Sequence, residues 1–244
     1  MGSASLLWVA MAITAIALLY STVGHGGASG YIAVLTLFSF SPETIKPTAL
    51  VLNLGVAALG TFQFWRAGYF SWKLFWPFTV LSAPGAWLGG YLHLHTDLLR
   101  PILGVILLFS ALRFAMKPND PAEVKRPGLP LSLILGAGIG FIAGLTGTGG
   151  GIFLTPLLLF GKWAHIRQAA AISAPFIFVN SFMGLWGFVG GGQIIPPLTS
   201  VLALAALFGG ALGAYSGSRI PVYLIRRVLS LVLVVAGLKM IYTH

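Results

Sequence analysis

The sequence predicts an all-α fold, a polytopic membrane helix bundle made of two inverted repeats. Three observations support this prediction. Only 7% of the 244 residues are charged while 57% are hydrophobic, and the mean hydropathy is +0.94. Apolar runs extend from one end of the chain to the other, and the two halves share a pattern of glycine motifs. Soluble domains carry about 25% charged residues, so this chain is expected to lie in a lipid bilayer.

Ten apolar segments, separated by Gly, Pro and charged residues, are expected to form helices. The first five cover 6–23, 27–40, 44–65, 71–93 and 97–116. The second five cover 130–146, 150–161, 165–189, 196–216 and 220–242. A spanning helix takes roughly 20 apolar residues, so each repeat is predicted to contain a Gly-broken helical hairpin plus three spanning helices, about 8 to 10 segments in total. No Lys or Arg precedes the first segment and no clean cleavage site of small residues follows it, so we expect it to remain as a helix.

The stretch between the two sets has the composition of a solvated linker. It holds two of the four acidic residues and three prolines within KPNDPAEVKRPG. We therefore divide the chain into a first membrane repeat at 1–116, a cytoplasmic linker at 117–129 and a second membrane repeat at 130–244. The other loops are too short for a separate soluble domain, so one bundle accounts for the whole length.

Matching motifs indicate that the second half duplicates the first. The cluster Gly24-His25-Gly26-Gly27 corresponds to Gly147-Thr148-Gly149-Gly150-Gly151, and Ile45-Lys46 corresponds to Ile166-Arg167. Four more residues match four others that each lie 124 positions later: Gly85, Leu88, Gly89 and Tyr91 with Gly209, Leu212, Gly213 and Tyr215. Matches at one offset, in the same order as the other motifs, predict an internal repeat.

The positive charges indicate how the repeats are oriented. A formal charge of +10 would suggest nucleic-acid binding in a soluble protein, but these basic residues stand singly or in pairs at the ends of apolar segments. Lys and Arg collect in cytoplasmic loops, so we expect the linker to be cytoplasmic. Eleven basic residues are then inside: Arg66, Lys73, Arg113, Lys117, Lys125, Arg126, Lys162, Arg167, Arg219, Arg226 and Arg227. Three are outside: Lys46, Arg100 and Lys239. The repeats are thereby inverted, with both termini outside, in a multi-pass protein of the cell inner (plasma) membrane.

Segments 27–40 and 150–161 are too short to span a hydrocarbon core of roughly 30 Å, and each follows a glycine-rich break. Broken helices at matching places in inverted repeats are typical of a transporter's substrate site. We expect half-helices that begin at Gly26 and Gly149, with free N–H groups that favour an anion. The alternative is that these glycines only permit close helix packing, as is expected for Gly85–Gly89 and Gly136–Gly140.

The predicted substrate site consists of both glycine clusters and nearby polar residues: Gly24, His25, Gly26, Gly27, Gly147, Thr148, Gly149, Gly150, Gly151, Thr22, Asn53 and Asn180. His25 is the ionisable side chain that the segment pattern places near mid-membrane, where it would donate to an anion or carry a proton. The alternative is a neutral His bonded to a carbonyl. Asn53 and Asn180 are equally compatible with hydrogen bonds between helices, because an unpaired amide in an apolar segment is costly.

The other polar residues exclude several classes of function. All four acids lie at segment ends or in the linker, which argues against a cation pump or a sodium symporter based on intramembrane carboxylates. The absence of cysteine excludes disulfides and thiolate metal sites. His93 and His95 do not share a helix face, so an interfacial cap is favoured over a metal site there. We expect no metal, no cofactor and no enzyme activity, because no reacting set of buried side chains is found.

The glycine motifs resemble those of a known family. The resemblance rests on GHGGASG, the matching GLTGTGGG, a basic residue after each short segment and the G-x-x-L-G repeat. On this basis the chain resembles the TauE/SafE family of sulfite and organosulfonate exporters over roughly residues 6–242. The resemblance implies a permease that moves small sulfur-containing anions such as sulfite or sulfoacetate without ATPase machinery. It implies as partners a small anionic substrate and the bilayer but no nucleic acid, and it leaves a homodimer open. The alternatives are an anion channel and an uptake permease for another small anion.

Overall fold

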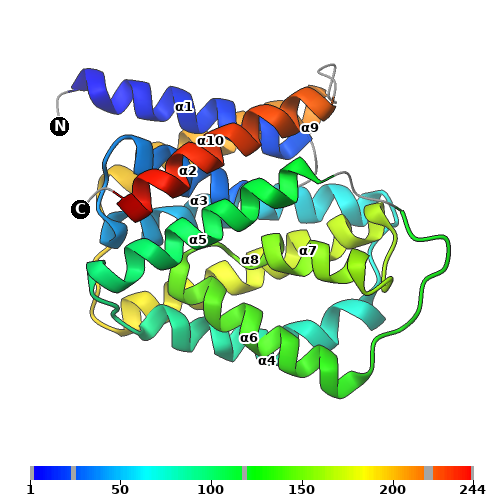
Figure 1. The fold of residues 1–244 in the computed structure, drawn as a ribbon. Coiled ribbons are helices and arrows are strands. Elements are labelled where there is room, and N and C mark those ends of the chain that lie inside the picture. Colours follow the sequence, from blue (N-terminus) through cyan, green and yellow to red (C-terminus); the bar gives the residue numbers. More distant parts are fainter. Residues whose placement is uncertain (1–2, 23–25, 117–119, 217–221, 243–244) are drawn as a thin grey trace.

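The computed structural model describes residues 3–22, 26–116, 120–216 and 222–242, which form an all-α bundle (Figure 1). The first repeat contains α1 (Ser3–Thr22), α2 (Ala28–Leu37), α3 (Pro42–Arg66), α4 (Trp72–Tyr91) and α5 (Thr96–Ala115). The second contains α6 (Leu129–Thr146), α7 (Gly151–Phe160), α8 (Ile166–Gly190), α9 (Leu198–Ser216) and α10 (Val222–Tyr242). The described residues hold these ten helices and no strand, so the predicted fold class is confirmed.

The helices begin and end close to the predicted segments. Pro42 and Pro130 stand in the first turns of α3 and α6, where the missing N–H of proline has no partner to lose. Gly147 ends α6 in a left-handed conformation (φ 81°), which glycine adopts without strain. His95 occupies the N-cap position of α5, as expected of an interfacial cap, but its side chain makes no capping hydrogen bond.

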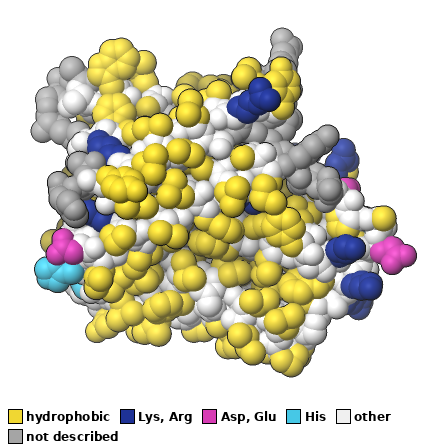
Figure 2. Space-filling view, viewed as in Figure 1, with side chains coloured by type: hydrophobic (Ala, Val, Ile, Leu, Met, Phe, Trp, Pro, Cys, Tyr) yellow, Lys and Arg dark blue, Asp and Glu magenta, His cyan; other side chains and the backbone are white. Residues whose placement is uncertain are grey.

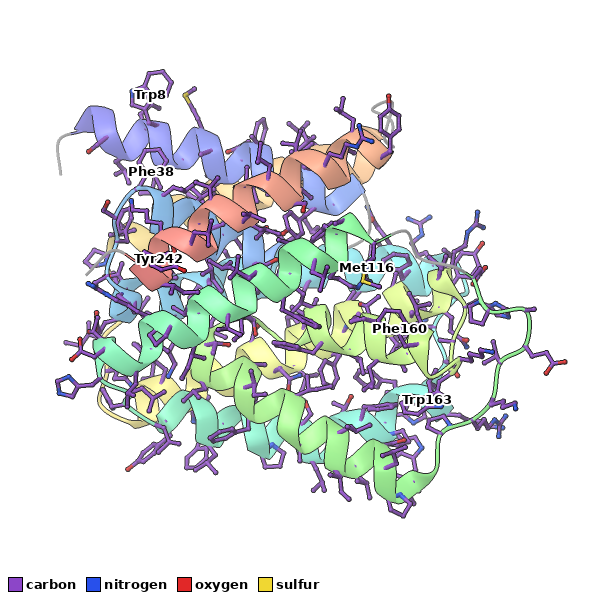
Figure 3. All side chains as sticks on the ribbon, viewed as in Figure 1. Trp8, Phe38, Met116, Phe160, Trp163 and Tyr242 are labelled. Carbon is purple, nitrogen blue, oxygen red and sulfur yellow. The ribbon has the colours of Figure 1, made fainter. Side chains whose placement is uncertain are left out.

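Corresponding helices of the two repeats run in opposite directions. In Figure 1, α1 begins and α10 ends at the left of the bundle, while residues 120–128 cross the right end. We call these the terminal end and the linker end. In Figure 3, Phe38 after α2 lies at the terminal end, whereas Phe160 at the end of α7 lies at the linker end. The predicted inversion of the repeats is therefore present in the structure.

Each repeat packs its first helix on the fourth helix of the other repeat. The most extensive contacts of α6 are with α4, and those of α1 are with α9. A Cβ added to Gly140 on α6 would lie 2.1 Å from the carbonyl oxygen of Ser82, and one on Gly209 of α9 would lie 2.2 Å from that of Thr14. Any side chain would strike backbone there, so these glycines let the helices touch. The small-residue packing predicted for the glycines of α4 and α6 is confirmed.

One of the sequence matches between the repeats differs from the match of the helix starts. Helix α3 begins at Pro42 and α8 begins at Ile166, 124 residues later. Counted from these helix starts, Lys46 has the position of Ala170, three residues beyond that of Arg167. The two basic residues also differ in surroundings, because Lys46 is buried while Arg167 is exposed and donates to the hydroxyl of Tyr69.

Two hydrophobic cores lie inside the bundle. The first core contains buried residues of α1, α2, α3, α5, α9 and α10, among them Ile32 and Leu103. The second core contains buried residues of α4, α7 and α8, among them Phe78 and Leu154. The short helices are thus divided between the cores, with α2 in the first and α7 in the second.

The outer surface is apolar. Figure 2 shows hydrophobic side chains over most of the visible face, with the charged side chains mostly toward its two ends. Four helices, α3, α5, α6 and α8, are long and apolar enough to cross a membrane by length and composition. Such an exterior is what the hydrocarbon region of a bilayer requires, and the chain is an integral membrane protein.

Candidate functional site

The two short helices begin inside the bundle, where their amino termini lie. Helices α2 and α7 have 10 residues each, so each is about 15 Å long, half of a hydrocarbon core. Their other ends reach opposite ends of the bundle, at Phe38 and Phe160 (Figure 3). Both amino termini therefore lie in the interior, away from either end. The predicted half-helices are confirmed, although they begin at Ala28 and Gly151, two residues later than expected.

Glycine is required at these breaks by the backbone conformation. The N-cap residues Gly27 and Gly150 have φ values of 80° and 82°, and Gly147 and Gly149 also have positive φ. A residue with a Cβ pays a steric penalty in this left-handed region. The N-cap glycines of the two short helices make no side-chain cap hydrogen bond, and no other described side chain is shown to cap these ends. These glycines therefore do more than permit close packing, in contrast to those between α4 and α6.

Both breaks meet at one side chain, Ile177 of α8. A Cβ on Gly26 would lie 2.9 Å from the Ile177 Cδ1 atom, and a Cβ on Gly151 would lie 2.3 Å from the same atom. A Cβ on Gly149 would lie 2.8 Å from Ile177 Cγ2. The structure thus brings together two glycine clusters that are far apart in the sequence.

The predicted site residues that the structure describes are in or beside these breaks, except Asn180, whose hydrogen bond is with Ser82 of α4. They are Gly26, Gly27, Gly147, Thr148, Gly149, Gly150, Gly151, Asn53 and Asn180, and all are buried. Gly24 and His25 lie outside the described residues. Thr22 is the last residue of α1, and its side chain is likewise outside the described part. The Thr148 hydroxyl is 3.1 Å from that of Thr146.

The two asparagines make contacts between helices and each retains one unused amide atom. Asn53 Nδ2 donates to the Gly147 carbonyl oxygen at 3.3 Å, and Asn180 Oδ1 accepts from the Ser82 hydroxyl. Within the described residues, Asn53 Oδ1 and Asn180 Nδ2 have no hydrogen-bond partner. The interpretation as links between helices is confirmed, while the unused donor of Asn180 leaves room for a ligand contact.

Two buried hydroxyls beside the breaks were not among the predicted site residues. The Tyr31 Oη atom lies against Gly27, and the Ser181 Oγ atom lies against Gly149. Both could have been suspected from the sequence, since Tyr31 follows the first break by four residues and Ser181 follows Asn180. What the sequence does not reveal is which helix faces they occupy.

Lys46, which the segment pattern counts among the outer charges, is a buried cation. It lies within α3 and is only 4% exposed. Its Nζ atom donates to the carbonyl oxygens of Gly89 (3.2 Å), Gly90 (3.1 Å) and Leu92 (3.2 Å) at the carboxyl end of α4. The partially negative end of a helix stabilises a cation, so the ammonium group is solvated by backbone. A Cβ on Gly147 would lie 2.7 Å from the Lys46 carbonyl oxygen, which places this residue directly beside the second break.

The region contains positive and dipolar groups but no buried acid. All four acidic residues, Glu43, Asp97, Asp120 and Glu123, are exposed. Within the described residues, no group of three His, Cys, Asp or Glu side chains is arranged to hold a metal ion. The arrangement therefore favours a ligand of negative charge.

An inverted-repeat bundle with two opposed half-helices at its centre defines a membrane transporter. The chain belongs to the TauE/SafE family, because the family described as "Sulfite exporter TauE/SafE" matches residues 9–240. The probable membrane transporter protein y4hK of Sinorhizobium fredii is 42% identical over 240 residues, which cover 96% of this chain and 97% of that protein.

More distant relatives carry the same description. The probable membrane transporter protein YfcA of Escherichia coli is 28% identical over 253 residues, covering 99% of this chain and 92% of YfcA. The probable membrane transporter protein YjnA of Bacillus subtilis is 26% identical over 245 residues, covering 91% of this chain and 94% of YjnA. No solved structure matches the chain at a significant level.

Proposed function

We propose that this membrane transporter is a carrier of small sulfur-containing oxyanions, such as sulfite, sulfoacetate or a related organosulfonate. The anion is held between the amino termini of α2 and α7, near the centre of the bilayer. The observation that carries this proposal is the meeting of two uncapped helix amino termini around Ile177, with no buried carboxylate among the described residues.

Electrostatics support an anionic substrate. Each helix amino terminus offers the equivalent of about half a positive charge and several unpaired N–H groups. Lys46, whose backbone carbonyl lies beside Gly147, carries a further buried positive charge on an ammonium group held at the carboxyl end of α4. Backbone donors bind an oxyanion without the cost of burying an arginine, and the modest affinity that results suits a carrier, which must release its cargo.

The family name supports sulfite as the first anion to test and export as the direction. We propose that the protein lies in the cell inner membrane, with a small anion and lipid as its partners, and that His25 donates to the anion or carries a proton. An anion channel, or an uptake permease for another small anion, is the alternative function. These two differ from an exporting carrier in their kinetics and direction.

Reconstitution into liposomes tests the proposed function. A carrier of sulfur oxyanions should show saturable uptake of radiolabelled sulfite or sulfoacetate. Unlabelled substrate should inhibit this uptake from the same side and accelerate it from the opposite side. Flux that neither saturates nor accelerates would identify a channel. Transport of sodium with no flux of any sulfur oxyanion would contradict both the electrostatic argument and the substrate assignment.

A further inference from the structure

Two buried hydroxyl groups, one at each glycine break, have no partner in the described part of the chain. They belong to Tyr31 of α2 and Ser181 of α8, and both residues are 0% exposed. A buried hydroxyl without a hydrogen bond is costly, and nearly all such groups in proteins are paired. Two such groups at the centre of a transporter therefore point to a ligand that satisfies them.

The Tyr31 hydroxyl lies at the amino terminus of its own half-helix. Side chains in a helix tilt toward its amino end, and Tyr31 is the fourth residue of α2. Its ring consequently lies beside the N-cap, so that a Cβ on Gly27 would be 2.6 Å from Tyr31 Oη. The neighbouring Tyr20 is also buried, but its hydroxyl is paired with Ser29 Oγ at 2.8 Å. The unpaired state of Tyr31 is thus not a general property of buried tyrosines in this bundle.

The Ser181 hydroxyl lies at the second break. A Cβ on Gly149 would be 3.0 Å from Ser181 Oγ and 3.2 Å from Asn53 Nδ2. Hydroxyls within helices usually bond to the carbonyl four residues earlier, as Thr155 does to Gly151 and Ser110 does to Ile106. Ser181 does not make this bond. Its donor capacity remains available to a group that lies beside Gly149.

Ile177 connects the two positions. Gly26, the residue before Gly27, contacts Ile177, and so does Gly149. Ser181 is one helical turn beyond Ile177 on α8. The two hydroxyls therefore adjoin breaks that meet at one side chain, although they come from different repeats.

We infer that Tyr31 Oη and Ser181 Oγ are the side-chain donors that bind the transported anion, one beside each half-helix. This inference rests on the proposed function. Sulfite and a sulfonate group each have three oxygens that point in different directions, so one anion can accept from both hydroxyls and from the N–H groups of both helices. Hydrogen bonds from O–H groups to a charged oxygen are shorter and stronger than neutral ones.

The chain offers two matched controls. Thr36 also carries a buried hydroxyl without a partner among the described residues, but it stands in the last turn of α2, away from the break. Thr36→Val therefore removes an unpaired hydroxyl that lies away from the proposed binding site. Tyr20→Phe removes a hydroxyl that is already paired within the protein.

The test compares Tyr31→Phe and Ser181→Ala with these controls in proteoliposomes. We expect each of the two variants to raise the KM for radiolabelled sulfite and sulfoacetate roughly 10-fold or more, the loss typical of a hydrogen bond to a charged group. Thr36→Val and Tyr20→Phe should keep the wild-type KM. Ser181→Thr retains the hydroxyl and should stay closer to wild type than Ser181→Ala.

Thermal unfolding in detergent gives a second readout that does not depend on reconstitution. Removing an unpaired buried hydroxyl relieves a cost, so without substrate Tyr31→Phe and Ser181→Ala should unfold at or above the wild-type temperature. The rise in unfolding temperature that sulfite or sulfoacetate produces should shrink in both variants but not in Thr36→Val.

The outcomes separate this inference from the proposed function. Wild-type protein that neither transports nor is stabilised by these anions overturns the proposed function and this inference together. Saturable wild-type transport with an unchanged KM in Tyr31→Phe and Ser181→Ala overturns this inference alone. An equal rise in KM for Thr36→Val also overturns it, because the position of the hydroxyl would then not matter.

Discussion

Lys46 brings a full positive charge into a protein that buries none of its four carboxylates. Three carbonyl oxygens at the end of α4 accept from its ammonium group, and the ring of Phe188 lies 5.6 Å from the nitrogen. A charge held only by dipoles is weakly compensated, so its field extends to nearby sites. Lys46 therefore joins α3 to α4 through its ammonium group.

We predict that Lys46→Met lowers the free energy of unfolding by about 2 kcal/mol, because it leaves carbonyls at the end of α4 without a donor. Thermal unfolding of the purified protein measures this change. Lys46→Arg should retain much of the stability, since it keeps a cationic donor. Lys239→Met is a matched control, because Lys239 makes a similar bond to the Leu37 carbonyl oxygen at 2.8 Å but is less buried. Equal losses at both lysines would contradict the role assigned to burial.

At the scale of elements, glycine serves two different purposes in this bundle. Between α4 and α6 it removes a Cβ that would strike backbone, as at Gly144, where a Cβ would lie 1.9 Å from the Ala86 carbonyl oxygen. At the breaks it provides left-handed backbone that other residues rarely adopt. The second purpose allows α7 to begin in the interior, with its first N–H groups free of side-chain caps.

We predict that Gly149→Ala strongly impairs transport. The left-handed conformation at φ 69° costs a non-glycine residue about 1–2 kcal/mol, and the new methyl would lie 2.8 Å from Ile177. Gly138→Ala is the control, since Gly138 is on α6 and a Cβ there meets nothing within 4 Å. Sulfite uptake and thermal unfolding of both variants provide the measurement. Wild-type uptake by Gly149→Ala would show that the break is not needed in this form.

The helices and the half-helices could be predicted from the sequence, whereas the contents of the site could be predicted only in part. Apolar runs and glycine breaks are local signals, so the segment ends agree with the structure to within a few residues. The role of Lys46 depends on the carbonyl groups of α4, which are more than 40 positions away in the chain. Similarly, the contact of Ile177 with both breaks arises from tertiary packing, and no local pattern reports it.

At the scale of the whole molecule, the ends of the bundle differ in charge in a way that predicts its orientation. Glu123 lies among basic residues of the linker end, whereas Asp97 lies in the first turn of α5 at the other end, and both are exposed. The native chain has no cysteine, so single cysteines can be labelled without background. We predict that an impermeant thiol reagent modifies Glu123→Cys only from the cytoplasmic side and Asp97→Cys only from outside. Labelling in the reverse pattern would overturn the orientation, and labelling of both from one side would overturn the inversion.

For the proposed carrier function, the two hydrophobic cores indicate how the site is exposed to each side in turn. Helix α2 belongs to the first core and α7 to the second, so a site between their amino termini lies between two packed bodies. Alternating access in inverted-repeat transporters is largely a movement of one such body against the other around a fixed site. Helices α3 and α8, which pack on each other across the boundary, would have to slide or tilt in each cycle.

A covalent link between α3 and α8 should therefore stop transport. A Cβ on Gly60 of α3 would lie 3.5 Å from the Cβ of Ala174 on α8, within the range that a disulfide requires. In the double variant Gly60→Cys/Ala174→Cys, we expect oxidation to abolish sulfite counterflow and reduction to restore it. The single variants control for the substitutions themselves, and oxidation should leave them unaffected. Full transport by the completely cross-linked protein would show that the two cores do not move relative to each other at this interface, and the substrate would then have to pass through a static bundle, as it does in a channel.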